Sequence, residues 1–181
     1  VHGGDAGVRA LNAALQARLN PAAPHRDELI LGRHTPGQPV VLRVGDKVRQ
    51  TRNDYQKRVF NGELGIVLSI DREDQLVQVR FDDATVSYAF AELDDLVHSW
   101  AMTVHAAQGS QWPAVVMILL SSHYVMLERN ILYTALSRAQ RLAVLITQER
   151  ALQIAVKRTT LVSRRTDLVA RLCASIAGRG S

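Results

Sequence analysis

The sequence predicts an α/β domain with a small β-barrel inserted into it. An apolar pattern with helical spacing opens the chain, short strand-like segments fill the middle, and alternating strand and helix patterns return near the end. The middle segments are too few and too short for a β-sandwich, which favours a barrel. With 181 residues, 47% of them hydrophobic, the chain is long enough to form packed cores.

The first predicted element is an amphipathic helix over residues 6–19. Its apolar residues recur every three or four positions from Val8 to Leu19, and Pro21 stops the pattern. Residues 20–41 hold four of the five prolines. We therefore expect an irregular connection there rather than a helix or a strand.

Short strands separated by turn signals begin at Val40. Glycine, asparagine and aspartate divide the segments, as they do in tight turns. The predicted strands are Val40–Val44, Lys47–Thr51, Gly65–Ile70, Gln75–Phe81, Thr85–Phe90 and a short one near Leu96–Trp100. Together they predict a barrel over residues 42–98.

After Trp100 the pattern becomes α/β again. The predicted elements are a turn over 103–111, strands over 114–120 and 142–147, and helices over 128–139, 148–157 and 166–177. Residues 1–41 and 99–181 are therefore expected to form one domain that the barrel interrupts. Because no strand precedes the leading helix, we expect the chain to be part of a longer polypeptide.

The charge is distributed unevenly. Residues 129–181 carry 10 basic and 2 acidic side chains, whereas residues 1–128 carry 12 basic and 15 acidic ones. This segregation is typical of a protein that turns one face toward nucleic acid, although an ordinary solvated surface explains it equally well. The sequence has no membrane-spanning apolar run and no secretory signal, so a cytoplasmic protein without membrane contact is expected.

Cysteine and histidine patterns exclude several kinds of site. The single cysteine, Cys173, cannot form an internal disulfide and is expected in the core. No Cys or His cluster has the spacing of zinc ligands, and no Ser or Cys has the setting of an acyl-transfer nucleophile. The sequence therefore favours neither a zinc protein nor a hydrolase of the serine or cysteine type.

The polar turn over 103–111 is the first candidate site. Gly109 lets backbone N–H groups approach an anion closely, and Thr103 and His105 can donate to a phosphate. The turn is therefore a candidate grip on a nucleic-acid backbone. An ordinary loop between a strand and a helix is the alternative.

Arg138, near the end of the predicted helix 128–139, is the second candidate. A cation there can simply stabilise the helix dipole. It can also act as an arginine finger that neutralises a transferring phosphoryl group. No G-x-x-x-x-G-K-[ST] sequence is present, so these residues alone are not expected to hydrolyse a nucleotide.

Four aromatic residues have side chains able to stack on nucleic-acid bases. Their apolar sequence neighbours favour packing in the core instead. They are Trp100, Trp112, Tyr124 and Tyr133.

Taken in order, these segments closely resemble the C-terminal part of the RecD-like superfamily 1 DNA helicases, the stand-alone bacterial type that moves 5′ to 3′. Thr103–Trp112 is similar to motif V of that family, Arg129–Ala139 to motif VI, and Gly7–Pro21 to the segment around motif IV. Gly45–Val48 and Val59–Gly65 resemble its SH3-like barrel. The resemblance implies a partial RecA-like domain of the P-loop NTPase type, lacking the P-loop, with an inserted small SH3-like β-barrel.

The resemblance also implies roles at the nucleotide. Arg138 is the expected catalytic residue, as the finger on the γ-phosphate. Gln108 and Gly109 are expected to line the ATP cleft, and Gln111 occupies the position where the family usually has a ribose-binding Glu. A neutral amide can still accept from a ribose hydroxyl, so we expect a weakened contact. ATP and Mg²⁺ would be bound mainly by the first RecA-like domain, outside this chain.

Single-stranded DNA is the partner that the resemblance implies, together with the N-terminal domains of the same polypeptide. Thr103 and His105 are expected to face the strand, with Asn12 near it. Ala106 stands where the family usually has Lys or Arg, which removes one cation from the DNA side.

Two other functions remain open on the sequence. A small barrel of this kind also suits a non-catalytic nucleic-acid-binding protein, and it suits a module that recruits a protein partner. Salt-sensitive affinity for single-stranded DNA separates these two readings.

Overall fold

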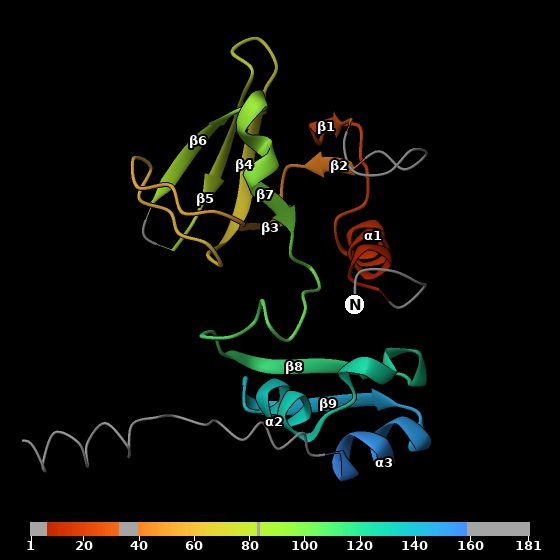
Figure 1. Ribbon diagram of the computed structural model, residues 1–181. Helices are drawn as coiled ribbons and strands as arrows, with labels where there is room; N and C mark the ends of the chain where they lie inside the picture. Colours follow the sequence, from red (N-terminus) through yellow and green to blue (C-terminus); the bar gives the residue numbers. More distant parts are fainter. Residues whose placement is uncertain (1–6, 33–39, 83, 159–181) are drawn as a thin grey trace, which may run out of the picture. The chain divides into compact units, whose positions relative to one another are not determined.

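The computed structural model describes residues 7–32, 40–82 and 84–158 (Figure 1). The predicted helix 166–177 and Cys173 lie outside these ranges. Contacts divide the described residues into two units, one within 7–118 and 134–146 and the other within 119–133 and 147–158. In the described ranges, no helix has the length and apolar character needed to cross a bilayer.

The opening helix α1 spans Val8–Leu19 and confirms the helix prediction. Its buried residues are nevertheless polar: Asn12 and Gln16 are covered, followed by Asn20 just after the helix. Leu19, on the apolar side, is 61% exposed. The amide side chains, not the leucines, thus form the most deeply buried face of this helix.

Strands β1 (Glu28–Leu31) and β2 (Val40–Arg43) form a two-stranded antiparallel sheet. The expectation of an irregular connection over residues 20–41 is therefore wrong for β1. Prolines flank that strand but none lies inside it, so its backbone N–H groups are free to pair. Arg43 also pairs with Glu28 across the two strands, Nε to Oε2 at 3.0 Å.

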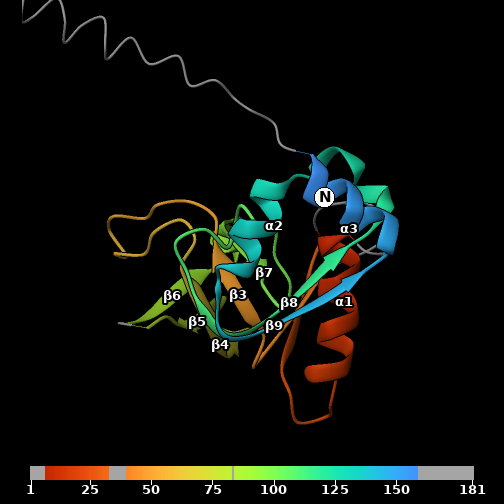
Figure 2. The same cartoon turned by 90° about the horizontal axis from the view of Figure 1, so that it is seen from below.

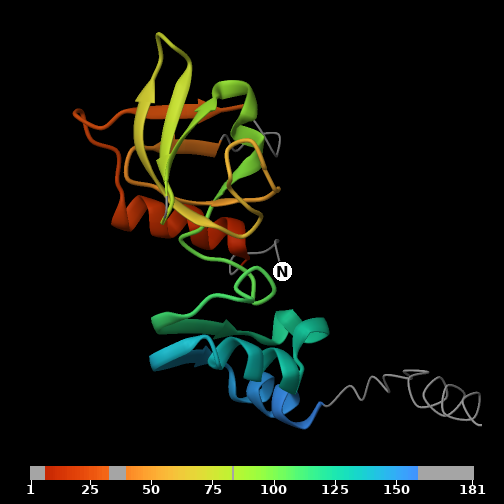
Figure 3. The same cartoon turned by 90° about the vertical axis from the view of Figure 1, so that its left-hand side faces the viewer.

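The middle of the chain forms a five-stranded antiparallel sheet in the order β6-β5-β4-β3-β7. Figure 3 shows this sheet curling on itself. The strands are β3 (Lys47–Gln50), β4 (Leu64–Asp71), β5 (Leu76–Arg80), β6 (Thr85–Ala89) and β7 (Leu96–His98), with a 3₁₀ helix η1 (Phe90–Asp95) before β7. These strands were predicted. The predicted strand at Val40–Val44 corresponds to β2 and pairs outside this sheet.

Alternating residues of the strands fill the core of the curled sheet. Val48, Val77 and Val79 are fully buried. Tyr88 is buried with them, and its hydroxyl donates to Gln50 Oε1 at 2.9 Å. The period-2 alternation of β-branched residues that predicts the strands also selects the face that packs.

Strands β8 (Trp112–Leu119) and β9 (Ala139–Thr147) form a second two-stranded sheet. They run in the same direction, as Figures 1 and 2 show. Trp112 N donates to the carbonyl of Arg138 at the start of this pair. The remaining elements are η2 (Ser121–Met126), α2 (Arg129–Leu136) and α3 (Glu149–Lys157).

The predicted helix 128–139 is too long by about a turn. Helix α2 ends at Leu136, so Arg138 lies in the turn before β9 rather than in the helix. Two short contacts close the helix: Arg138 N donates to the carbonyl of Ala135, and the Ser137 hydroxyl donates to the carbonyl of Thr134. A serine that bonds back to the preceding turn competes with helical continuation.

Candidate functional site

The loop over 103–111 is built from overlapping turns. Ala106 N donates to the Thr103 hydroxyl at 3.2 Å, and Ala107 N donates to the Thr103 carbonyl at 3.1 Å. Gly109 has a φ of +89°, in the region that only glycine adopts readily. A Cβ at this position would meet nothing within 4 Å. The backbone conformation, and not lack of space, therefore favours glycine here.

Arg138 lies against this loop. Its Nη1 donates to the Ser110 carbonyl at 3.3 Å, directly after Gly109 in the chain. Its Nε donates to the Thr134 carbonyl at 3.3 Å, and its Nη2 to the Ser137 hydroxyl at 3.4 Å. The side chain is half-buried. The structure thus brings together the two candidate sites that the sequence separates by about thirty residues.

The hydrogen bonds of Arg138 leave it available to a ligand. They lie at the long end of the hydrogen-bond range, so each is weak. They use three of the five N–H donors of a guanidinium, which leaves two among the described residues. The three predicted ATP-side residues of the loop, Gln108, Gly109 and Gln111, are all exposed. A half-buried forked cation beside an exposed glycine turn can bind an anion.

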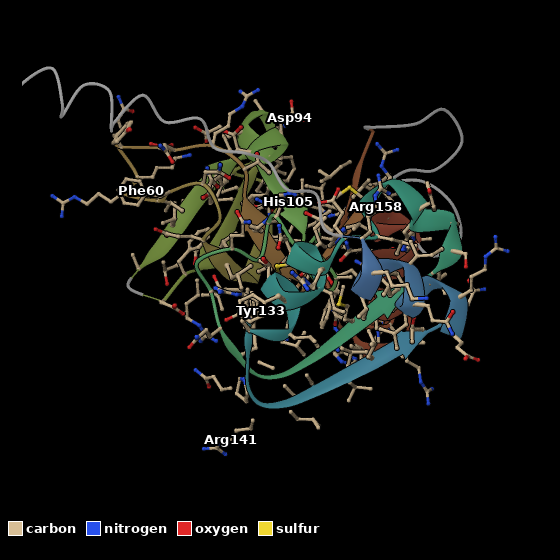
Figure 4. The ribbon with its side chains drawn as sticks, turned by 60° about the horizontal axis from the view of Figure 1, so that its bottom comes forward. Phe60, Asp94, His105, Tyr133, Arg141 and Arg158 are labelled. Atoms are coloured by element: carbon tan, nitrogen blue, oxygen red, sulfur yellow. The ribbon has the colours of Figure 1, made fainter. Side chains whose placement is uncertain are left out.

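The two loop residues predicted to face DNA differ in exposure. His105 is exposed and labelled in Figure 4, whereas Thr103 is half-buried and its hydroxyl oxygen accepts from Ala106 N. The exposure of these two side chains does not show whether they contact DNA, so both roles remain predictions.

Asn12 is buried and fully engaged. Its Nδ2 donates to the carbonyls of Val8 and Ala101, at 2.9 and 2.8 Å. Its Oδ1 accepts from Ala101 N at 2.9 Å. These bonds join α1 to the segment that leads into the loop at Thr103. In this arrangement Asn12 positions that segment, and its predicted place near the DNA strand remains a prediction.

A buried carboxylate that the sequence did not single out holds α1 to the curled sheet. Asp46 is fully buried. Its Oδ2 accepts from Gln16 Nε2 at 2.6 Å and from Arg43 N at 2.7 Å. His98 Nε2 donates to the same oxygen at 3.0 Å, and Asn20 Nδ2 donates to Oδ1 at 2.8 Å.

The pKa of Asp46 reflects this surrounding. Burial alone would raise it, but the hydrogen bonds from His98, Asn20 and the Arg43 backbone outweigh burial and hold the pKa below its ordinary value. The sequence indicated a turn at Gly45 and Asp46 and a resemblance of Gly45–Val48 to the SH3-like barrel, but no buried network around Asp46. The available signal was the spacing of Asn12, Gln16 and Asn20, which places three amides on one helix face.

Two of the aromatic residues expected in the core are exposed. Tyr124 is 58% exposed and Tyr133 is 73% exposed (Tyr133 is labelled in Figure 4). Trp100 and Trp112 are half-buried. The core expectation is therefore wrong for both tyrosines, because apolar neighbours in sequence do not place a side chain on the packed face of a helix.

Comparisons with known families and proteins match both parts of this arrangement. Residues 11–81 match the SH3 domain of ATP-dependent RecD-like DNA helicases, and residues 98–146 match the UvrD-like helicase C-terminal domain. The chain is 40% identical to the ATP-dependent RecD2 DNA helicase of Deinococcus radiodurans, over 93% of the chain and 22% of that protein. It is 33% identical to the RecBCD enzyme subunit RecD of Mycolicibacterium smegmatis, over 71% of the chain and 22% of that protein.

Solved structures give the same fold. A Pif1 helicase studied for DNA unwinding at forked duplexes has a TM-score of 0.50 and 26% identity, covering 81% of the chain and 40% of its own. A Bacteroides Pif1 helicase, solved with ADP-AlF3 and single-stranded DNA, has a TM-score of 0.60 and 19% identity, covering 99% and 45%. The structure therefore has the mixed α/β architecture of these helicases, with an SH3-like sheet. The chain spans about a fifth of the length of the curated relatives it matches.

Proposed function

Because the chain belongs to the RecD-like DNA helicases, we propose that it forms the C-terminal part of an ATP-dependent 5′ to 3′ DNA helicase or translocase. The observation that carries this proposal is the contact between Arg138 and the loop over 103–111. It joins the two segments that the family resemblance assigns to the nucleotide and to DNA. The same kinship supports a cytoplasmic protein.

In this proposal Arg138 is the catalytic residue and acts as an arginine finger. Its two remaining donors and its half-buried position fit a phosphate oxygen, since a forked guanidinium binds such oxygens in pairs. Gln108 and Gly109 line the nucleotide side of the loop. Gln111 accepts a hydrogen bond from the ribose, more weakly than a carboxylate would.

On the DNA side, Thr103 and His105 contact the backbone of a single strand. The exposed ring of His105 can donate to a phosphate without help from another residue. Asn12 acts through Ala101, whose backbone it holds at both N and O, and so fixes the start of the loop. One loop therefore carries the residues proposed to bind the nucleotide and those proposed to bind DNA. A movement of Arg138 can in this way change how Thr103 and His105 contact the DNA.

ATP with Mg²⁺ supplies the phosphoanhydride bond whose hydrolysis releases the free energy. The N-terminal domains of the same polypeptide are proposed to bind most of both. The contribution of this chain is electrostatic: Arg138 is always charged and needs no proton transfer to stabilise negative charge on a transferring phosphoryl group. Its weak hydrogen bonds with backbone carbonyls allow it to exchange partners between nucleotide states.

The test uses the complete polypeptide that carries this chain. Arg138→Ala should lower DNA-stimulated ATP turnover by roughly 10³-fold or more, by comparison with known arginine fingers, while affinity for single-stranded DNA is kept. Arg138→Lys should recover little, because it keeps the charge and loses the fork. Arg141→Ala, at an exposed position of β9, is the matched control and should leave turnover unchanged. Unchanged turnover in Arg138→Ala would remove the assigned role.

A non-catalytic nucleic-acid-binding protein is the second candidate, and one observation favours it. Tyr55 and Phe60, in the loop between β3 and β4, are 73% and 44% exposed and lie edge to face with centroids 6.0 Å apart. Exposed aromatic rings on a small barrel suit base stacking. In that case the complete polypeptide would bind single-stranded DNA in a salt-sensitive way and show no DNA-stimulated ATPase.

A further inference from the structure

A groove on the second unit is lined by cations. Its volume is about 710 Å³, and its walls come from η2, α3 and Arg158 directly after α3. None of its six described lining residues is acidic. They are Tyr124, Arg150, Gln153, Ile154, Lys157 and Arg158.

Helical spacing places two of these cations on one side of the groove. Arg150 and Lys157 lie seven residues apart in α3, so they share a face of the helix. At a rise of 1.5 Å per residue they are separated by about 10 Å along the axis. Both are exposed. The neighbouring carboxylate of Glu149 accepts from Gln153 Nε2 at 3.2 Å, which partly satisfies that acid.

Tyr124 is held in place at the edge of the groove while much of its ring stays open. The guanidinium of Arg158, labelled in Figure 4, lies 5.2 Å from the ring centroid. Its Nη1 also donates to the Tyr124 carbonyl at 3.0 Å. Tyr124 is nevertheless 58% exposed. A cation–π contact and a backbone bond thus limit the freedom of the residue before any ligand arrives.

We propose that this groove binds single-stranded nucleic acid, with a base stacked on Tyr124 and backbone phosphates at Arg150 and Lys157. The proposal rests on the proposed function, in that the chain acts on DNA, and adds a binding surface separate from Thr103 and His105. An exposed aromatic ring beside cations matches the alternation of base and phosphate along a strand. An acidic protein partner would use the cations but would gain little from the open ring.

The test measures affinity for a fluorescent oligo(dT) and for an abasic strand of the same length, at several salt concentrations. Tyr124→Ala should weaken binding of oligo(dT) by roughly tenfold or more and leave binding of the abasic strand unchanged, because only a base can stack. Tyr124→Phe should keep the affinity. Neither change removes the carbonyl that Arg158 bonds.

The double variant Arg150→Ala/Lys157→Ala tests the binding of phosphates. It should weaken both strands and lower the slope of log K against log salt by about 0.7 for each phosphate that is no longer neutralised. Arg18→Ala/Arg80→Ala is the matched control, because both residues are exposed and the same charge is removed from α1 and β5. Circular dichroism of each variant checks that the fold is kept.

Three results would overturn the proposal: unchanged affinity in Tyr124→Ala, equal losses on oligo(dT) and on the abasic strand in that variant, or equal losses in the two double variants. These outcomes are independent of ATP hydrolysis. A complete polypeptide without ATPase would defeat the proposed function and leave this binding measurement intact. Absence of binding at the groove, together with normal turnover that depends on Arg138, would defeat the groove proposal and leave the proposed function intact.

Discussion

Replacing Asp46 by Asn removes the charge from the buried network between α1 and the curled sheet. Oδ2 accepts three hydrogen bonds and Oδ1 accepts one. An asparagine that keeps its oxygen on the three-donor side must turn its NH₂ group toward Asn20 Nδ2, which is itself a donor. One bond is lost, two buried donors face each other, and the other three bonds lose their ionic character. We expect Asp46→Asn to lower the free energy of unfolding by about 3 kcal/mol at pH 7.

The effect should depend on pH in a defined direction. The pKa of folded Asp46 lies below its ordinary value of 3.8, so its contribution is fully present above that value and is lost as the pH falls through the folded pKa. The difference between wild type and Asp46→Asn should therefore be present at about pH 5 and shrink below about pH 4. Urea unfolding followed by tryptophan fluorescence at several pH values measures it.

Asp71→Asn is the matched control for this variant. Asp71 lies exposed at a turn, where its Oδ1 accepts from Glu73 N and Asp74 N. An asparagine oxygen can accept the same two bonds, so the change should be under about 0.5 kcal/mol. A loss in Asp46→Asn no larger than in this control, or a loss that stays constant below pH 4, would refute the reasoning about the buried network.

Substitutions at Gly65 and Gly109 should destabilise the fold for two different reasons, a steric clash and a strained backbone. In Gly65→Ala the new Cβ would lie 2.6 Å from Val79 Cγ1 and 3.1 Å from the Arg80 carbonyl, so the free energy of unfolding should fall by about 1–3 kcal/mol. Gly32→Ala is the control: a Cβ there meets open space, so the free energy of unfolding should not change. In Gly109→Ala the space is open but φ is +89°, so a loss of about 1–2 kcal/mol should come from the backbone alone. Gly109→Asn should lose less, because asparagine tolerates this region; equal losses for Ala and Asn would show that φ is not the cause.

Sequence periodicity predicted most of the strands within two or three residues. It succeeded for β3 to β6 because one face of each strand packs against Val48, Val77 and their neighbours, and burial of one face imposes a period of two. It missed β1, where the surrounding prolines outweighed a four-residue run. It also placed the end of α2 too late, because the turn at Ser137 depends on a side-chain bond that no apolar pattern records.

The candidate site was predictable to a different degree in its two parts. The polar residues of the loop and Arg138 could be selected from residue type and motif order, and the structure places Arg138 in contact with the loop at the Ser110 carbonyl. The role of Asn12 and the network around Asp46 could not be predicted in this way. Their hydrogen-bond partners lie at separations from 3 to 89 positions in sequence, with no common spacing. Such pairings follow from how the elements pack, which a single sequence does not specify.

The paired bonds between Asn12 and Ala101 have a consequence for how this chain can vary. Asn12 and Ala101 are 89 positions apart in sequence and are joined by two hydrogen bonds, so the segment between them is a loop whose two ends are held together. Lengthening a closed loop is thermodynamically inexpensive, about 0.6 kcal/mol for each doubling. We therefore expect that relatives can differ in the length of the segment between Asn12 and Ala101 while the residues after Ala101 keep their position against α1.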